Sequence, residues 1–204
     1  DYIDSKRDIL SPASVRTYTN MIGRLSDKFQ KTNLYDITQE LVQKEINDYS
    51  VDHAPKTARS LHGFISSVLG IYRPQFVLKT TLPRLEKQKR YLPSYDDIKR
   101  VLDTVNGTEY VIPFKLGILG LRRGEICALE LSDLKDRELA INKTVVYNKG
   151  WKIKKNPKTD EANRIILIPE QLANEIKDAG KIYDGDPKRL NKHLQRVQKQ
   201  LDIP

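Results

Sequence analysis

The sequence predicts a mainly helical chain of the α+β class that carries a small antiparallel sheet. Apolar residues recur every three or four positions through residues 11–73, which is the helical period, and no strand-like alternation interrupts them. After Asp136 the apolar period shortens to two, which indicates strands. Helical patterns return at 169–179 and 187–201. We therefore expect a helical bundle followed by a second region in which helices carry a sheet.

The helical bundle is expected to fill residues 1–73. Ser11 followed by Pro12 is a typical helix start, because the hydroxyl caps the first turn and proline suits a position that needs no N–H donor. Thr38 and Pro55 open two further amphipathic segments. Three or four short helices in this length favour one compact helical bundle with its own core.

An interdomain linker is expected over residues 74–93. Prolines and basic residues interrupt the periodicity there, and no helical pattern spans the segment. Its basic residues are Arg84, Lys87, Lys89 and Arg90.

The second region is expected over residues 94–204. It opens with a capping box, in which the side chains of Ser94 and Asp97 each serve the other's backbone N–H. Strands are expected over 139–146 and 164–168, where apolar and β-branched residues are frequent. This region therefore predicts a helical domain with a small sheet.

Charge and cysteine content limit the classes of function. The formal net charge is +9, with 15 basic and 10 acidic residues before Tyr91 and 21 and 17 from there onward, so both regions are basic. Such a chain suits a polyanion such as nucleic acid, although charge alone is equally typical of a moderately basic soluble domain. The single Cys127 excludes a disulfide framework and a cysteine-rich zinc site, and we expect it to be a packed thiol.

From the sequence we expect neither a membrane location nor a complete chain. No segment approaches the roughly 20 apolar residues that cross a bilayer, and the first ten residues contain no signal-peptide core. The chain begins with Asp1 rather than methionine, and its last residues are typical of a helix that leads into further structure. We expect a cytoplasmic fragment of a longer protein.

Two groups of charged residues lie at predicted turns. The first is Gly120-Leu121-Arg122-Arg123-Gly124-Glu125, and the second comprises Asn156-Pro157-Lys158-Thr159 and Arg164-Ile165-Ile166-Leu167-Ile168-Pro169. Taken singly, the first is typical of a solvated helix start, and Lys158 is typical of a solvated hairpin. Their order is apolar helix, arginine beside glycine, helix, acidic turn, hairpin and Arg-apolar strand. In that order they resemble the tyrosine recombinase (phage integrase) family.

The resemblance runs from about Ser11 to the last residue, and it implies a domain organisation and an activity. The first region is similar to the family's core-binding, SAM-like DNA-binding domain. The second is similar to the first part of the integrase-type catalytic domain, with the C-terminal part missing. The complete protein would be a site-specific DNA recombinase that cuts and rejoins DNA through a 3′-phosphotyrosyl intermediate.

The resemblance also assigns catalytic roles to three residues. Arg122 matches the first catalytic arginine, Glu125 the acidic residue that supports it, and Lys158 the lysine of the hairpin loop. A guanidinium can hold two oxygens of a phosphodiester as its charge increases, and a carboxylate can orient that guanidinium. A lysine whose pKa is lowered can protonate the leaving oxygen. This chemistry needs neither a metal nor another cofactor.

Further basic residues are candidates for binding DNA. They are the linker residues named above, Arg123, and Lys152, Lys154 and Lys155 of the hairpin. Arg123 has two interpretations: it either binds a phosphate outside the site or pairs with an acidic side chain.

The second catalytic cluster of the family begins with His-x-x-Arg, and His193-Leu194-Gln195-Arg196 has this spacing. We nevertheless interpret His193 and Arg196 as an ordinary helix surface, because the apolar residues around them define an amphipathic helix that matches the one before the cluster. All ten tyrosines precede the place where the family's nucleophile falls. We therefore expect the nucleophile to lie outside these 204 residues, so that the fragment binds DNA and does not cut it.

The implied partners are double-stranded DNA and, for the complete protein, other copies of itself in a synaptic tetramer. No membrane partner is expected, and the implied location is the cytoplasm of a bacterium or a phage-infected host. Two alternatives remain open from the residues: a non-catalytic DNA-binding protein on the same scaffold, and a basic interaction domain that does not touch nucleic acid.

Overall fold

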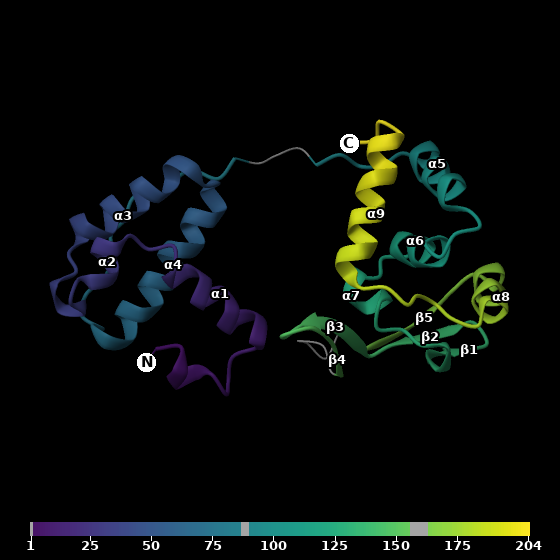
Figure 1. The fold of residues 1–204 in the computed structure, drawn as a ribbon, viewed down its shortest axis with the longest axis horizontal. Coiled ribbons are helices and arrows are strands. Elements are labelled where there is room, and N and C mark those ends of the chain that lie inside the picture. Colours follow the sequence, from purple (N-terminus) through teal and green to yellow (C-terminus); the bar gives the residue numbers. More distant parts are fainter. Residues whose placement is uncertain (1, 87–89, 156–162) are drawn as a thin grey trace. The chain divides into compact units, whose positions relative to one another are not determined.

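A computed structural model describes residues 2–86, 90–155 and 163–204. The chain divides into two compact units, Asp1–Lys89 and Arg90–Pro204 (Figure 1). The first is helical and the second combines helices with antiparallel strands, so the predicted α+β class is confirmed. Within the described residues, no helix is long and apolar enough to cross a membrane.

The first unit is a bundle of short helices. In chain order these are η1 (Asp4–Lys6), α1 (Pro12–Ile22), α2 (Asp27–Lys31), η2 (Leu34–Asp36), α3 (Gln39–Asp52) and α4 (Pro55–Tyr72). The expected caps are present, because the Ser11 hydroxyl accepts a hydrogen bond from Ser14 N–H and the Thr38 hydroxyl accepts one from Leu41 N–H. The bundle closes around fully buried side chains of α3 and α4, among them Val42, Ile46, Leu61 and Leu69.

Residues 74–86, which we expected to begin the linker, pack along this bundle. The Gln39 side chain bonds the backbone of Val77 and Lys79, and the Gln43 side chain bonds both backbone groups of Thr81. Arg59 donates to the Pro83 carbonyl. Side chains of α3 and α4 thus satisfy the backbone groups of a segment that has no secondary structure of its own.

The second unit contains the helices and strands that position Arg122, Glu125 and Arg164. Its helices are α5 (Tyr95–Val105), α6 (Val111–Ile118), α7 (Arg123–Ile126), η3 (Leu131–Asp133), α8 (Glu170–Ala179) and α9 (Pro187–Gln200). Its strands are β1 (Leu134–Lys135), β2 (Glu138–Ile141), β3 (Lys143–Tyr147), β4 (Trp151–Lys155) and β5 (Arg164–Leu167). Strands β1, β2 and β5 form one antiparallel sheet in that order, and β3 and β4 form a separate hairpin.

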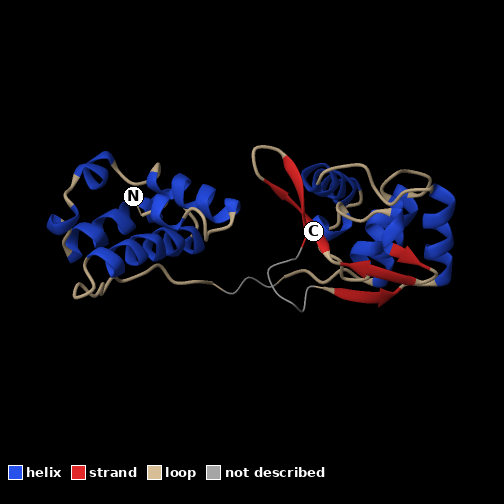
Figure 2. Cartoon of the chain, turned by 90° about the horizontal axis from the view of Figure 1, so that it is seen from below, coloured by secondary structure: helices blue, strands red, loops and turns tan. Residues whose placement is uncertain are grey.

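The strand expected over 139–146 is two strands in different sheets. Ile141 pairs with Arg164 in the three-stranded sheet, and Lys143 pairs with Lys155 in the hairpin, so the chain changes partner at the exposed Asn142. Figure 2 shows the hairpin extending away from the three-stranded sheet.

One buried cluster holds the second unit together. Leu116 of α6, Leu139 and Ile141 of β2, and Ile176 of α8 are almost fully buried in it. Leu190 and Val197 of α9 belong to the same cluster, so α9 is an integral part of this core.

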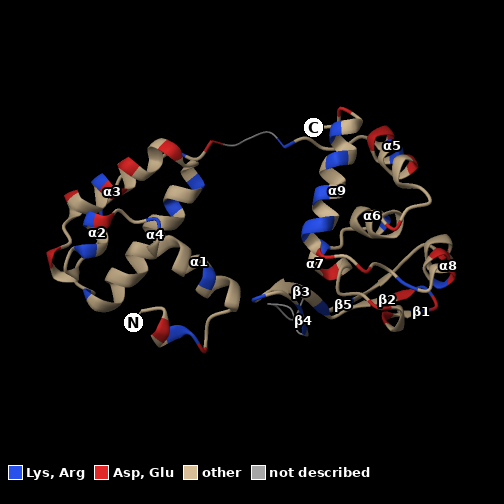
Figure 3. Cartoon of the chain, in the orientation of Figure 1, with Lys and Arg blue, Asp and Glu red and all other residues tan. Residues whose placement is uncertain are grey.

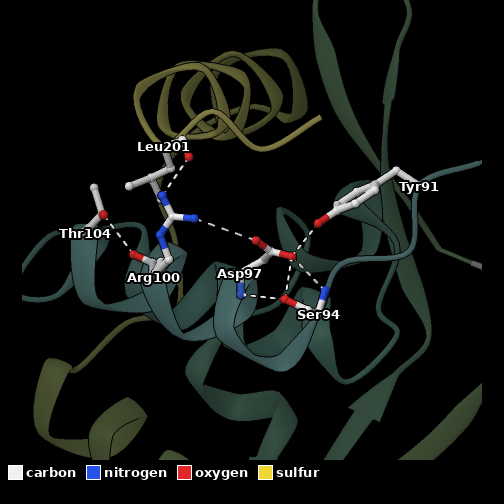
Figure 4. Close-up of polar contacts among 6 residues, drawn as sticks. All are labelled: Tyr91, Ser94, Asp97, Arg100, Thr104 and Leu201. Carbon is white, nitrogen blue, oxygen red and sulfur yellow. Dashed lines mark hydrogen bonds and ion pairs between the residues drawn. The ribbon is translucent and has the colours of Figure 1, made fainter.

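The start of α5 has the capping box that the sequence predicts. The Ser94 hydroxyl accepts from Asp97 N–H at 3.1 Å, and the Asp97 carboxylate accepts from Ser94 N–H at 2.8 Å and from the Tyr91 hydroxyl (Figure 4). Hydrogen bonds from Ser94 and then Tyr91 lower the pKa of Asp97 to about 2. One turn further along, Arg100 donates to the Leu201 carbonyl at 2.7 Å, which ties α5 to the end of α9.

Candidate functional site

The site is built where α6 turns into α7. Gly120 follows α6 with a φ of +89°, a conformation that residues with a Cβ rarely adopt. Leu121 is then buried in the core, and Arg122 has an extended backbone that precedes the first turn of α7. Because the turn is anchored by Leu121, it directs the Arg122 side chain outward, where it is 74% exposed.

Glu125 is the buried centre of the site. Its side chain is 3% exposed, and both carboxylate oxygens accept hydrogen bonds. Arg122 donates its backbone N–H at 2.9 Å and its Nη1 at 2.8 Å, while Arg164 of β5 donates Nη2 at 2.9 Å and Nη1 at 3.3 Å. The carboxylate therefore joins α7 to the three-stranded sheet through two arginines.

Opposing effects act on the pKa of Glu125, and their sum lowers it. Burial acts to raise this pKa because it disfavours the charged form, and the hydrogen bonds from Arg164 and Arg122 outweigh that effect. Glu125 is thus a carboxylate at neutral pH, and it fixes one end of the Arg122 guanidinium. Arginine has five N–H donors, so the solvent-facing donors of Arg122 stay available to an anion.

Gly124 lets the site approach the hairpin closely. A Cβ at this position would lie 2.7 Å from Thr144 Oγ1 and 3.1 Å from the Val145 carbonyl oxygen of β3. The start of β3 is anchored in turn by Lys143, which is buried and whose Nζ contacts the carboxylates of Glu130 and, at 2.9 Å, Asp133. Helix α7 and strand β3 therefore hold each other in place.

The structure does not describe every predicted site residue. Lys87, Lys89 and Lys158 lie outside the described residues, and of Lys155 only the backbone is described. Nothing in the geometry therefore tests the role that the resemblance gives to Lys158, which stays a prediction.

The remaining predicted DNA contacts are exposed. Arg84 belongs to the first unit and Arg90 to the second, and Lys152 and Lys154 follow each other on one face of β4. Arg123 is also exposed, and among the described residues no carboxylate pairs with it. This favours the phosphate-binding interpretation of Arg123 over the ion-pair interpretation.

Sequence reasoning did not assign Arg164 to the site. The sequence places it at the start of an apolar strand, where an arginine is an unremarkable surface residue. Only the pairing of Ile141 with Arg164, which aligns β5 beside β2, brings its guanidinium to Glu125.

The structure corrects the interpretation of His193. Its ring is half-buried and stacks on the Tyr110 ring, with centroids 3.6 Å apart and planes 7° apart. Burial, and then the charge of Arg196, lower the pKa of His193. The ring therefore packs on Tyr110 as a neutral aromatic group rather than lying on an open helix surface, whereas Arg196 is exposed as expected.

Comparison with known proteins identifies the fold of this chain. No protein-family model matches the chain, and no curated protein matches it. A lambda integrase dimer bound to a COC′ core site matches with a TM-score of 0.70 over 97% of this chain and 62% of that chain, at 15% identity. The chain has the tyrosine recombinase fold.

Two further solved structures agree with this fold. Lambda integrase (residues 75–356) bound to DNA matches with a TM-score of 0.66 over 97% of this chain and 76% of that chain, at 13% identity. The Tn1549 transposon integrase in complex with a circular intermediate DNA matches with a TM-score of 0.66 over 87% of this chain, at 12% identity. The chain spans 62% of that integrase chain.

The close approach at Gly124 predicts that alanine destabilises the chain more at Gly124 than at Gly117. We expect Gly124→Ala to lower the free energy of unfolding by about 1–3 kcal/mol, because the new Cβ meets β3 backbone that cannot move without disturbing the hairpin. Gly117→Ala, inside α6, is the matched control, since a Cβ at Gly117 would lie 3.9 Å from its nearest neighbour, Ile126 Cδ1. This substitution should be neutral or stabilising by up to about 1 kcal/mol. Urea unfolding of the chain measures both. Equal effects at the two positions would contradict the packing of α7 on β3.

The lowered pKa of Glu125 predicts an acid-sensitive site. A carboxyl group whose pKa is lower in the folded chain stabilises the fold above its ordinary value of 4.5, and this stabilisation is lost as the pH falls toward its folded pKa. Urea unfolding of wild type and Glu125→Gln between pH 7 and pH 3 should give curves that converge in acid. A difference between the two proteins that stays constant with pH would contradict an ionised Glu125.

Proposed function

We propose that this chain binds double-stranded DNA as part of a site-specific tyrosine recombinase and that Arg122 holds the scissile phosphate. The observation that carries the proposal is an exposed guanidinium whose inner end is fixed by a buried carboxylate. An oriented arginine offers paired donors to the non-bridging oxygens of a phosphodiester, whose charge rises in the transition state. The fold supports the same function, because solved proteins with it are integrases in complex with DNA.

Glu125 and Arg164 are positioning residues in this proposal. Glu125 neither touches the phosphate nor transfers a proton, because both of its oxygens are occupied by arginine donors and the carboxylate is buried. Arg164 balances the charge of Glu125 from the sheet side, which leaves Arg122 with donors for the ligand.

The remaining parts of the reaction are assigned by the resemblance of the sequence. Lys158 is the proposed proton donor to the leaving 5′ oxygen, and the proposed nucleophilic tyrosine is not among the ten of this chain. The whole protein is proposed to act in the cytoplasm and to assemble with copies of itself on DNA.

Covalent-adduct formation tests the catalytic assignments. The protein as encoded in full should form an adduct with a nicked duplex carrying a sequence that it selects from a random pool. Arg122→Ala should lower the rate about 10²–10³-fold, as for the loss of one donor to a developing oxyanion. Lys158→Ala should lower it about 10²–10⁴-fold if it is the general acid.

The matched control is Lys181→Ala, which removes an exposed lysine that Asp184 already pairs at 2.7 Å, and it should cut at the wild-type rate. Wild-type cleavage by the Arg122 or the Lys158 variant would overturn the role of that residue. An adduct formed by the 204-residue chain alone would contradict the absence of the nucleophile from it.

A further inference from the structure

One group of polar side chains, which the proposed site does not use, joins the start of α5 to the end of α9. The side chain of Asp97 is 13% exposed, and its carboxylate accepts from Ser94 and from the Tyr91 hydroxyl. One turn further along α5, the Arg100 guanidinium has Nη1 3.8 Å from the Asp97 carboxylate and donates Nη2 to the Leu201 carbonyl at 2.7 Å. We call Tyr91, Asp97 and Arg100 the α5 cluster (Figure 4).

Tyr91 is the residue through which the incoming chain is attached to α5. Residues 74–86 pack on the first unit through side chains of α3 and α4, and the second unit begins at Arg90. Leu92 is exposed, and so is the ring of Tyr91. The hydrogen bond from the Tyr91 hydroxyl to Asp97 therefore holds the chain in place before α5 begins.

The end of α9 has a conformation that fixes the direction of the chain beyond it. Asp202 has a φ of +52°, and Ile203 N–H donates to the Gln198 carbonyl at 2.9 Å, which is a Schellman motif. The last carbonyls of a helix have no donor within the helix, and Arg100 supplies the donor for the carbonyl of Leu201. Arg100 thus holds the turn at which the chain leaves α9.

Apolar packing between α5 and the end of α9 is incomplete beside this cluster. A pocket of about 440 Å³ is lined by Asp97 and Val101 of α5 and by Leu194, Gln198 and Ile203. Side chains that face such a space lack packing partners on one side, so the pocket leaves room for α5 to shift against α9. Figure 3 shows the charged residues of α5 beside the C-terminal end of α9. The position of that end therefore depends on the polar contact as well as on the core.

We propose that the α5 cluster couples the entry of the linker to the exit of α9, with Tyr91 and Arg100 as positioning residues at its two ends. The Asp97 carboxylate accepts from Tyr91 and from both the N–H and the hydroxyl of Ser94, so its orientation is fixed and it attracts Arg100 to one place. A displacement of the chain at Tyr91 therefore reaches the Leu201 carbonyl through a contiguous set of contacts.

This inference rests on the proposed function and deepens it. In the proposed recombinase the nucleophilic tyrosine belongs to a part of the protein outside this chain. The α5 cluster would make the position of the chain beyond α9 depend on how the linker is held.

Amide hydrogen exchange in the 204-residue chain tests the coupling. The amides of Leu201 and Ile203 report on the end of α9, and NMR follows their exchange in wild type, Tyr91→Phe, Arg100→Met and the double variant. Matched controls are Tyr95→Phe and Lys99→Met, which alter exposed neighbours on the same helix. Circular dichroism checks that each variant is folded.

Arg100→Met should speed exchange at the two amides about 3–10-fold, because it removes the hydrogen bond to the Leu201 carbonyl. Tyr91→Phe should speed the same amides about two- to fivefold, although Tyr91 does not touch α9. The double variant should exchange no faster than Arg100→Met alone, since the effect of Tyr91 passes through Arg100. The controls should match wild type. Unchanged exchange in Tyr91→Phe, or additive effects in the double variant, would overturn the inference.

Covalent-adduct formation by the protein as encoded in full tests the consequence for the reaction. Tyr91→Phe and Arg100→Met should each lower the rate about 3–10-fold and keep the affinity for the duplex within about twofold of wild type, because they change positioning. Tyr95→Phe and Lys99→Met should cut at the wild-type rate. A wild-type rate in both cluster variants would overturn the inference and leave the proposed function intact. Absence of any adduct with the wild-type protein would overturn the proposed function, and the exchange rates would still decide the coupling.

Discussion

The hydrogen bonds of the buried Glu125 carboxylate with two arginines are the interactions on which the candidate site depends. A carboxylate can be buried only when charged donors replace its water shell, and here two guanidinium groups and a backbone N–H do so. Because the donors come from α7 and β5, their common acceptor fixes the turn that carries Arg122 against the sheet. The same interaction leaves Arg122 oriented and still exposed, which is what an anion-binding side chain requires.

The packing around this carboxylate extends its effect to the hairpin. Gly124 allows β3 to lie directly against α7, and the buried Lys143 holds the beginning of β3 at η3. Strand β3 pairs with β4, and the proposed general acid Lys158 follows β4 in the sequence. The hairpin that precedes Lys158 is therefore in contact with the turn that carries Arg122. Helix α9 completes the surroundings of the turn, because its first two turns and Arg123 line one groove. The turn that carries Arg122 therefore lies between the hairpin and helix α9.

Local patterns in the sequence predicted the features that depend on neighbouring residues. The helix starts at Ser11, Thr38 and Ser94 were correct because a cap is satisfied within three residues. Features that depend on contacts between distant segments were not predicted. The period of two changes phase by one residue between Ile141 and Thr144, and such a change does not by itself distinguish a bulge within one strand from a change of sheet.

The candidate site shows the same division between local and distant contacts. Arg122 and Glu125 are three residues apart, and their partnership follows from the spacing together with the resemblance of the motif. The role of Arg164 depends on the register between β2 and β5, and the packing of residues 74–86 depends on side chains of α3 and α4. His193 is a surface position by helical period, yet the ring of Tyr110 from a distant segment covers it. In each case a partner far along the chain determines the environment of the residue.

The order of the Arg122 side chain tests the central claim most directly. NMR relaxation of the arginine Nε–H groups in the 204-residue chain gives an order parameter for each guanidinium, and Arg122→Lys identifies the signal. If Glu125 holds Arg122, the order parameter should be close to the rigid-backbone value of about 0.85, and it should fall below about 0.6 in Glu125→Gln. The exposed Arg196, which has no carboxylate partner among the described residues, serves as the internal reference for a mobile side chain. An Arg122 as mobile as Arg196 in the wild-type chain would contradict the account.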